Sequence, residues 1–536
     1  MNLDPHGANA RGAALMSVGT MLSRATGLIR VSFTLAALGL TATSDAYNAA
    51  NTTPNMVYEL LLGGILTSVF VPVFVERMRS RGEWQETASR FLTLALVILA
   101  GLTLLGLIAA PWIMRLYLSG VTDPVRREAQ IALGTTLLRW FMPQVVFYGL
   151  GAVAGGILTA HRRFAPPMFA PILNNVAVIL TMGVFIAWGA DGLGSATLGA
   201  GRVTLLGLGT TLGVVAMTVA LWPALRGIGF SWRWRLELRD EAVRSLFRLG
   251  AWVAVYVAAN QIAYFWIINL NNRIGEGAYT AYSQAFVFFS LPHAIVAVSI
   301  FTVLLPGMAE RWTDGDREGV AALCARGMQN TQAFMLPAAA GLFALAGPIV
   351  ALLAGYGAVG DADQRLLIGA LQGFALGLPF FSAFQLLTRT AYATLDSRTP
   401  AFVNIVVAIV NLTAAWLLAF TVDLGVRGMA LGHAASYVAG TGVLYAILHG
   451  RLGGLHGKQL ASTILRAGAS AALCGVAAWG AGVALGSVLS LDRPPFRLVQ
   501  VLGAVLAGVL AFTAAAFMFG VREVDDVRTA LKTRWR

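Results

Sequence analysis

The sequence predicts an all-α polytopic membrane protein with fourteen transmembrane helices. Of its 536 residues, 57% are apolar and only 12% are charged, whereas a soluble domain has about 25% charged residues. Apolar runs of about 20 residues, long enough to cross a hydrocarbon core about 30 Å thick, recur along the chain. Because these runs are continuous rather than alternating, they indicate helices and not the strands of a membrane barrel.

The predicted spans share a composition rich in Leu, Ala, Val and Gly. Gly347-Pro348 is expected to interrupt the ninth span, and Asn51, Asn55 and Glu59 make the second one unusually polar. In chain order the spans are residues 13–38, 45–73, 89–113, 130–158, 167–188, 200–222, 243–269, 278–304, 325–353, 365–387, 401–421, 428–449, 462–486 and 498–520.

The net charge of +13 is distributed unevenly between the two sides of the membrane. With the N-terminus inside, the cytoplasmic segments hold 26 of the 38 Lys and Arg residues, the outward segments hold 9, and three lie within spans. This bias follows the positive-inside rule and predicts that both termini are cytoplasmic. The basic residues are expected to contact anionic lipid rather than nucleic acid. The two cysteines are far apart in sequence, which argues against a disulfide framework or a zinc site.

Two segments of similar sequence suggest an internal repeat. Residues 68–77 close the second span and residues 302–311 close the eighth, and Pro, Glu and Arg coincide at an offset of 234; Pro166 and Pro400 match at the same offset. We expect two parallel-repeat six-helix lobes around a central cavity, with chance similarity as the alternative. The predicted lobes are residues 1–225 and 243–450, joined by a cytoplasmic linker at 226–242. Residues 451–521 form two further helices, and 522–536 form a cytoplasmic tail.

Arg24 and Arg30 in the first span are the strongest candidates for a substrate-binding role. A charge at bilayer depth costs roughly 2.5 kcal/mol or more, so it requires a partner or a hydrated cavity. Six residues separate the two side chains by about 9 Å along a helix and by about 120° around it. A guanidinium group matches phosphate oxygens bidentately, which predicts an anionic substrate group. The alternatives are pairing with Asp45 or Glu59, or extension of the side chains toward water.

Further candidates lie in the second, fourth and seventh spans. Asp45 opens the second span, and Asn55 and Glu59 share one face beyond Pro54, which is expected to kink the helix or only to shape its packing. Arg139 in the fourth span could pair with Glu59. The seventh span and its end carry a polar series for which we favour cavity lining over hydrogen bonds between helices; it comprises Asn260, Gln261, Tyr264, Asn269, Asn271, Asn272 and Arg273.

Other polar residues within spans are expected to serve packing. His293 is more often a hydrogen-bonding core residue than a proton relay in such a setting. Helix contacts are expected for Asn174, Asn175, Asn404 and Asn411. The sequence has no Gly-x-x-x-x-Gly-Lys loop and no His-Glu-x-x-His motif, so we expect a transporter and not an enzyme, without a bound cofactor and without direct use of ATP. A coupling ion is expected, but its identity is open.

Several short motifs resemble those of the MurJ/MviN family, in the multidrug/oligosaccharidyl-lipid/polysaccharide exporter superfamily. They are Ser23-Arg24-x-x-Gly27-x-x-Arg30, Asp45-Ala46, Pro54-Asn55-Met56, Phe70-Val71-Pro72 and Leu304-Leu305-Pro306. The resemblance implies a flippase for lipid II, working by alternating access and driven by the membrane potential or an ion gradient. It places Arg24, Arg30 and Asp45 at functional positions.

The chain also departs from the family pattern at two places where many members have cationic residues. Tyr58-Glu59 follow Pro54-Asn55, and Phe286, Val287 and Ser290 stand in the eighth span. Arg139 or Arg273 is expected to compensate, or the contacts with the substrate differ.

The resemblance implies a bacterial cytoplasmic (inner) membrane location and a monomer that contacts membrane lipids. The expected substrate is lipid II or a similar anionic polyprenyl-pyrophosphate lipid whose tail stays in a groove between helices, and cell-wall synthesis proteins are candidate partners. One alternative is an exporter of another polyprenyl-linked glycan or a drug antiporter coupled to an ion, which would depend on Glu59. The other is a scaffold that organises wall synthesis.

Overall fold

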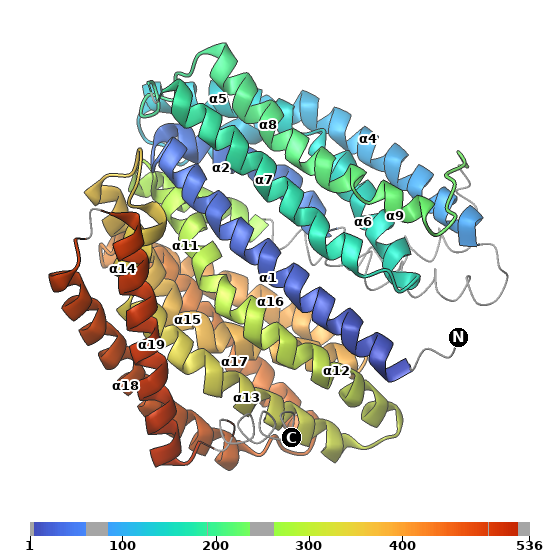
Figure 1. Cartoon of the computed structure of the whole chain (residues 1–536), viewed down its shortest axis with the longest axis vertical. Helices are drawn as coiled ribbons and strands as arrows, with labels where there is room; N and C mark the ends of the chain where they lie inside the picture. The colour runs from blue at the N-terminus through green and yellow to red at the C-terminus, as the bar shows by residue number, and fades with distance from the viewer. Residues whose placement is uncertain are drawn as a thin grey trace. The chain divides into compact units, whose positions relative to one another are not determined.

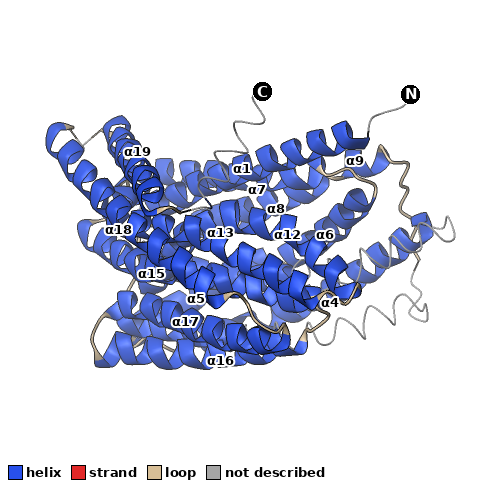
Figure 2. Cartoon of the chain, turned by 90° about the horizontal axis from the view of Figure 1, so that it is seen from below, coloured by secondary structure: helices blue, strands red, loops and turns tan. Residues whose placement is uncertain are grey.

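The computed structural model describes residues 5–60, 84–189, 191–235, 262–490, 493–521 and 523, with side chains from residue 19 onward except at 57–60. Across these ranges all regular secondary structure is helical (Figures 1 and 2). The N-terminal helices are α1 (Pro5–Leu38), α2 (Ala42–Leu60), α4 (Trp84–Tyr117), α5 (Pro124–Phe141), α6 (Gln144–Ala160), α7 (Ala165–Trp188), α8 (Ala200–Val219) and α9 (Trp222–Arg226). The later helices are α11 (Ala278–Pro292), α12 (Val298–Thr313), α13 (Arg317–Ala344), α14 (Ala346–Ala354), α15 (Asp361–Ala393), α16 (Arg398–Trp416), α17 (Gly425–Arg451), α18 (Gly457–Val488) and α19 (Pro494–Phe519), with π-helical turns at His293–Ala297 and Leu417–Thr421.

The apolar helices agree with an all-α polytopic membrane protein. Within the described ranges, eleven helices are long and apolar enough to cross a membrane, and the bent pair α13 and α14 raises the number to twelve. The second predicted span extends beyond residue 60 and most of the seventh precedes residue 262, so both lie partly outside the described residues. The total of fourteen therefore stays a prediction.

The ninth predicted span is broken where its sequence suggested. Helices α13 and α14 meet at Leu345 with a bend of 69°. Proline lacks an amide hydrogen and its ring clashes with the carbonyl four residues earlier. For Pro348 that carbonyl belongs to Ala344, the last residue of α13, while Pro348 itself lies in the first turn of α14, where proline is tolerated. The expected interruption is confirmed.

The chain forms two compact units. The first comprises Met1–Thr280 with Gly357–Val359, and the second comprises Ala281–Tyr356 with Gly360–Arg536. In the first unit α1 packs against α7, α2 against α5, and α7 against α8. In the second unit α15 packs against α17, α16 against α17, and α18 against α13 and α19. The lobe boundaries expected from the sequence stay a prediction.

The segment after α9 is neither helix nor strand over residues 231–235. It lies along α4: the indole of Trp232 donates to Thr93 Oγ1 (3.1 Å), the amide of Arg233 donates to Ser89 Oγ (3.3 Å), and the guanidinium of Arg235 contacts Glu86 (3.2 Å). Trp234 is 64% exposed. An aromatic and basic segment of this kind is suited to the interfacial region of a membrane.

Candidate functional site

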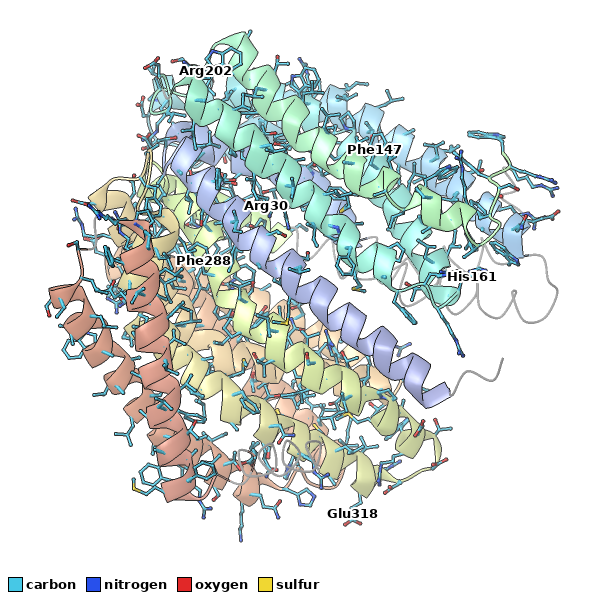
Figure 3. The ribbon with its side chains drawn as sticks, in the orientation of Figure 1. Arg30, Phe147, His161, Arg202, Phe288 and Glu318 are labelled. Atoms are coloured by element: carbon cyan, nitrogen blue, oxygen red, sulfur yellow. The ribbon has the colours of Figure 1, made fainter. Side chains whose placement is uncertain are left out.

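The first helix carries two arginines within the candidate membrane span Gly19–Leu38. Helix α1 continues through Gly27 without a break, so Arg24 and Arg30 keep their separation along and around one axis. Arg24 is exposed. Arg30, labelled in Figure 3, is partly buried. Among the described side chains, neither guanidinium has a hydrogen bond or an ion pair with a carboxylate. Within the described part of the chain, neither arginine is therefore paired with Asp45, while the side chain of Glu59 lies outside the described residues.

A hydrogen-bonded asparagine fixes α1 against its neighbour. Asn175 of α7 is 6% exposed, and its amide nitrogen donates to the carbonyl of Ser23 (3.1 Å) and to Thr26 Oγ1 (3.0 Å). These two bonds flank Arg24 in the sequence and confirm the expected contact role of Asn175. They limit rotation of α1 in this region and so fix the direction from which Arg24 leaves the helix.

The start of α2 is joined to the start of α11 by Asp45. Its carboxylate is 2% exposed and accepts three hydrogen bonds: from the amide of Gly277 (2.8 Å), from the amide of Thr280 (3.0 Å) and from Thr280 Oγ1 (2.8 Å). Asp45 thus caps the N-terminus of a helix more than 230 residues away. Pairing of Asp45 with Arg24 or Arg30, one of the alternatives from the sequence, is wrong because its oxygens are used by α11.

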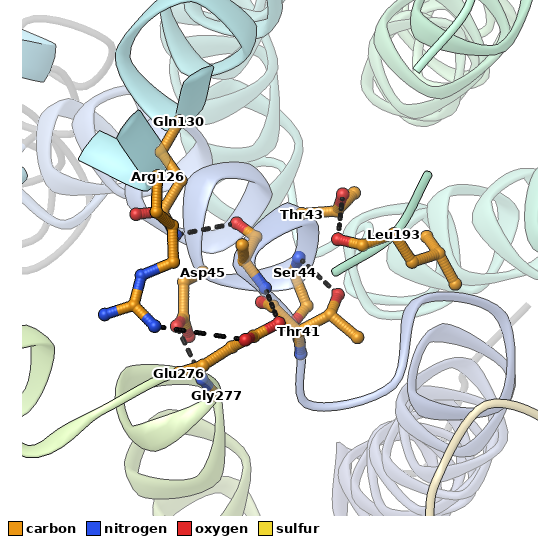
Figure 4. A network of polar contacts seen from close by, with 10 residues as sticks. Thr41, Thr43, Ser44, Asp45, Arg126, Gln130, Leu193, Glu276 and Gly277 are labelled. Atoms are coloured by element: carbon orange, nitrogen blue, oxygen red, sulfur yellow. Dashed lines mark hydrogen bonds and ion pairs between the residues drawn. The ribbon is translucent and has the colours of Figure 1, made fainter. Parts of the chain in front are cut away.

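A second carboxylate makes the reciprocal contact. Glu276 Oε1 accepts a hydrogen bond from the amide of Ala42 (2.9 Å), the first residue of α2, while its other oxygen lies 3.9 Å from the guanidinium of Arg126. Gln130 donates to the carbonyl of Ala42 (2.9 Å), and both it and Arg126 come from α5 (Figure 4). The N-terminus of α2 is therefore contacted by Glu276, which lies just before α11, and the N-terminus of α11 is contacted by Asp45, which lies in the first turn of α2.

Gly277 is required at this joint for two reasons. Its φ of +74° lies in the left-handed region, which favours glycine. A Cβ atom there would also lie 2.4 Å from the carbonyl oxygen of Leu40. The joint therefore depends on a glycine as well as on the two carboxylates.

The other candidate residues are placed as follows. Asn55 of α2 is partly buried and accepts a hydrogen bond from Tyr148 (3.2 Å), whereas the side chain of Glu59 lies outside the described residues. Arg139, in the last turn of α5, and Arg273 are both exposed. Tyr264 lies 3.4 Å from the hydroxyl of Tyr279. Asn260 and Gln261 lie outside the described residues. No substrate role of these residues is tested by their positions, so each stays a prediction.

Three asparagines of the seventh span do not line a cavity, contrary to the reading favoured from the sequence. Asn269, Asn271 and Asn272 are at most 4% exposed. Asn269 accepts from the hydroxyl of Ser119 (2.6 Å) and the amide of Gly120 (2.9 Å), and Asn272 donates to the carbonyl of Tyr117 (3.1 Å). Asn269 and Asn272 thus bind the turn after α4, whereas Asn271 donates to the carbonyl of Ile267 in its own helix (2.9 Å).

In the second unit, His293 has the packing role expected for it. The ring is 8% exposed, its Nδ1 lies 2.9 Å from Ser382 Oγ, and it packs 4.6 Å from the ring of Phe381. Across the part of the chain that the structure describes, no three His, Cys, Asp or Glu side chains gather closely enough to hold a metal ion.

Comparison with known proteins decides the family. The family described as "Lipid II flippase MurJ" matches residues 35–491. The chain belongs to this family. A MurJ lipid II flippase of Burkholderia cenocepacia is 28% identical over 406 residues, covering 74% of this chain and 76% of the relative. A probable MurJ lipid II flippase of Thermotoga maritima is 25% identical over 514 residues, covering 95% and 97%.

A solved MurJ structure has the same fold. The lipid II flippase MurJ in its inward closed conformation matches with a TM-score of 0.74 at 20% identity, covering 94% of this chain and 98% of that one. The MurJ-like fold thus extends along nearly the whole chain, and the resemblance seen in the short sequence motifs is confirmed. The chain is a multi-span membrane protein of a bacterial transporter family.

Sequence reasoning missed three residues that the MurJ fold brings to the joint: Glu276, Arg126 and Gln130. One signal was present. Glu276 and Ala42 are separated by 234 residues, which is the offset of the predicted repeat. Equivalent positions near a repeat axis can contact each other, so this offset could have directed attention to Glu276.

Proposed function

We infer that this chain flips lipid II from the cytoplasmic to the outer leaflet by alternating access. Membership of the MurJ family carries the substrate assignment. Arg24 and Arg30 of α1, which have no ion pair among the described side chains, are proposed to supply the chemistry. A pyrophosphate group offers several oxygens to guanidinium forks. In a site from which most water is excluded, such contacts are stronger than at an open surface.

Arg24 and Arg30, which follow one another along α1, are both proposed to bind the pyrophosphate group. Their spacing of about 9 Å along the axis is too long for both to grip one phosphate. It suits a headgroup that passes from one guanidinium to the next, or one that spans both. Arg139, Arg273, Asn55 and Glu59 are proposed to line the same path, as are Tyr264, Asn260 and Gln261.

Asp45 is proposed to act on the conformational cycle rather than on the headgroup. It is buried and its acceptors are occupied by α11. If transport moves α2 relative to α11, the Asp45 and Glu276 contacts must break and re-form in each cycle. A joint made of a few charge-assisted hydrogen bonds is strong enough to hold one state and weak enough to be reversed.

The remaining features complete the proposal. The chain acts as a transporter without catalytic chemistry and without a bound cofactor, as a monomer in the bacterial inner membrane with both termini in the cytoplasm. The membrane potential or an ion gradient supplies the energy, and membrane lipids and cell-wall synthesis proteins are its other partners. The positive-inside charge bias supports this orientation.

The test is leaflet-resolved labelling of lipid II in cells that depend on this chain. Arg24→Ala should abolish the appearance of lipid II in the outer leaflet, and Arg24→Lys should retain only part of it, because an ammonium group cannot bind bidentately. Arg427→Ala, at another exposed arginine, is the matched control and should flip normally. If outer-leaflet lipid II persists after depletion of the chain in cells without another flippase, the proposed function is wrong.

The two alternative functions predict other results. A drug antiporter would lose transport with Glu59→Gln, and a scaffold would keep its function with Arg24→Ala.

A further inference from the structure

We propose that the turn between α6 and α7 forms a binding site for the phosphate group of an anionic phospholipid. This site is separate from α1 and does not depend on transport of lipid II. A cavity of about 350 Å³ opens there, lined by Arg162, Arg163 and Phe164 of the turn, by Pro166 of α7 and by Ala224 and Gly227 of the α9 region. Its size suits a phosphate diester with part of its glycerol.

Among the described residues, the side chains that line the cavity carry only positive charge. Arg162 and Arg163 are exposed, and neither guanidinium has a hydrogen bond or an ion pair among the described residues. None of the described residues that line the cavity is acidic. The nearby carboxylate of Glu86 is already shared by Arg90 (3.6 Å) and Arg235 (3.2 Å). Two adjacent arginines without an acidic partner attract a phosphate group.

The backbone presents both arginines at the same turn. Arg162 has a φ of +57°, in the left-handed region, and its amide bonds to the carbonyl of Thr159 while that of Arg163 bonds to the carbonyl of Leu158. The turn therefore closes α6 and directs two consecutive basic side chains away from the helix axis. An arginine in a left-handed conformation is locally strained, whereas glycine there would not be.

Aromatic side chains lie close to basic ones at this end of the unit, a combination typical of a lipid surface. The ring of Trp84 lies 4.5 Å from the ring of His161, which precedes Arg162, and 6.1 Å from that of Phe230. Arg226 lies 5.9 Å over the ring of Trp222. Tryptophans beside arginines are typical of the headgroup region, so a lipid phosphate is a better fit than a phosphate free in solution. The charge bias of the loops predicts that this surface is cytoplasmic.

Native mass spectrometry of the full-length chain in detergent tests the site. The probes are phosphatidylglycerol, zwitterionic phosphatidylcholine and soluble glycerol 1-phosphate. The variant is Arg162→Gly with Arg163→Gln, since glycine suits the backbone at residue 162. The control is Arg326→Gln with Arg398→Gln, which removes two exposed arginines, also predicted to be cytoplasmic, in the second unit. An unchanged apparent melting temperature confirms that each variant is folded.

The wild-type chain should retain phosphatidylglycerol in preference to phosphatidylcholine. The variant at the turn should bind it about thirtyfold more weakly, as expected for two lost arginines near a membrane surface, whereas the control should bind normally. Equal retention by the turn variant, or equal loss in both variants, would overturn the proposal. So would displacement of the lipid by an equal concentration of glycerol 1-phosphate. Because lipid II is not a probe, a failure of the flippase assignment would leave these results unchanged.

Discussion

Replacement of Asp45 tests the joint between α2 and α11 most directly. Asp45→Ala removes a buried acceptor of three hydrogen bonds and leaves the amides of Gly277 and Thr280 without it. Loss of an N-cap costs about 0.5–2 kcal/mol, and each buried donor left unsatisfied costs about 1–3 kcal/mol. These costs overlap, so we expect a loss of about 3 kcal/mol in the free energy of unfolding.

Asp45→Asn should cost about half as much, because an amide oxygen in the position of Oδ1 still accepts the two bonds from Thr280, while the NH2 group faces the amide of Gly277. The assay is the apparent melting temperature of the purified chain in detergent, together with the double variant that adds Thr280→Val. Thr280→Val removes the hydroxyl contact of 2.8 Å with Asp45 together with the contacts of 3.1 Å with Ser44 and Asn48. The part of its effect that comes from Asp45 should disappear in the Asp45→Ala background, so the two losses should sum to less than their separate values. Strictly additive losses, or an Asp45→Ala chain as stable as the wild type, would refute this account.

Two further predictions concern helix packing and helix capping in the second unit. Gly377→Ala should destabilise the chain by about 1–3 kcal/mol, because the new Cβ would lie 2.8 Å from both Cα and Cβ of Ala434; Gly369→Ala, whose nearest neighbour would be at 3.5 Å, should be neutral or stabilising in the same melting assay. Asp316 caps α13 through the amide of Gly319 (2.7 Å), and this hydrogen bond, with a further contribution from Arg311, holds the pKa of the carboxyl below its ordinary 3.8. A lowered pKa means that the carboxylate stabilises the fold at neutral pH and that this contribution is lost as the pH falls through the lowered value. The melting temperature of the wild-type chain should therefore exceed that of Asp316→Ala at pH 7, and the difference should shrink as the pH falls below 3.8; a difference independent of pH would contradict the assignment.

The sequence predicts the fold best where the effect of a residue is confined to the neighbouring backbone. Pro348 predicts the break after Ala344 because the clash is local. The apolar runs likewise predict helices, since backbone groups in lipid must bond internally. By contrast, a polar face on a helix has the same periodicity whether it meets water or another chain segment. The pattern therefore favours a cavity for Asn269 and Asn272, although their partners lie in the turn after α4.

The candidate site was predictable in part for the same reason. Arg24 and Arg30 stand out because charge within an apolar run is rare and costly. The role of Asp45 could not be read from its surroundings in the sequence, since its partners are Gly277 and Thr280. Long-range contacts of this kind depend on the packing of whole helices. In the sequence, only the repeat offset of 234 residues indicates that the regions of Ala42 and Glu276 could meet.

The contact between Ala42 and Glu276 has a consequence for the origin of the chain. If the two halves descend from one duplicated gene, these positions come from the same ancestral codon. In a homodimer of the ancestral half, that position would have faced its own copy across a two-fold axis, as in any isologous interface. Fusion would then have freed each copy to diverge, so that one now supplies a backbone amide and the other a carboxylate.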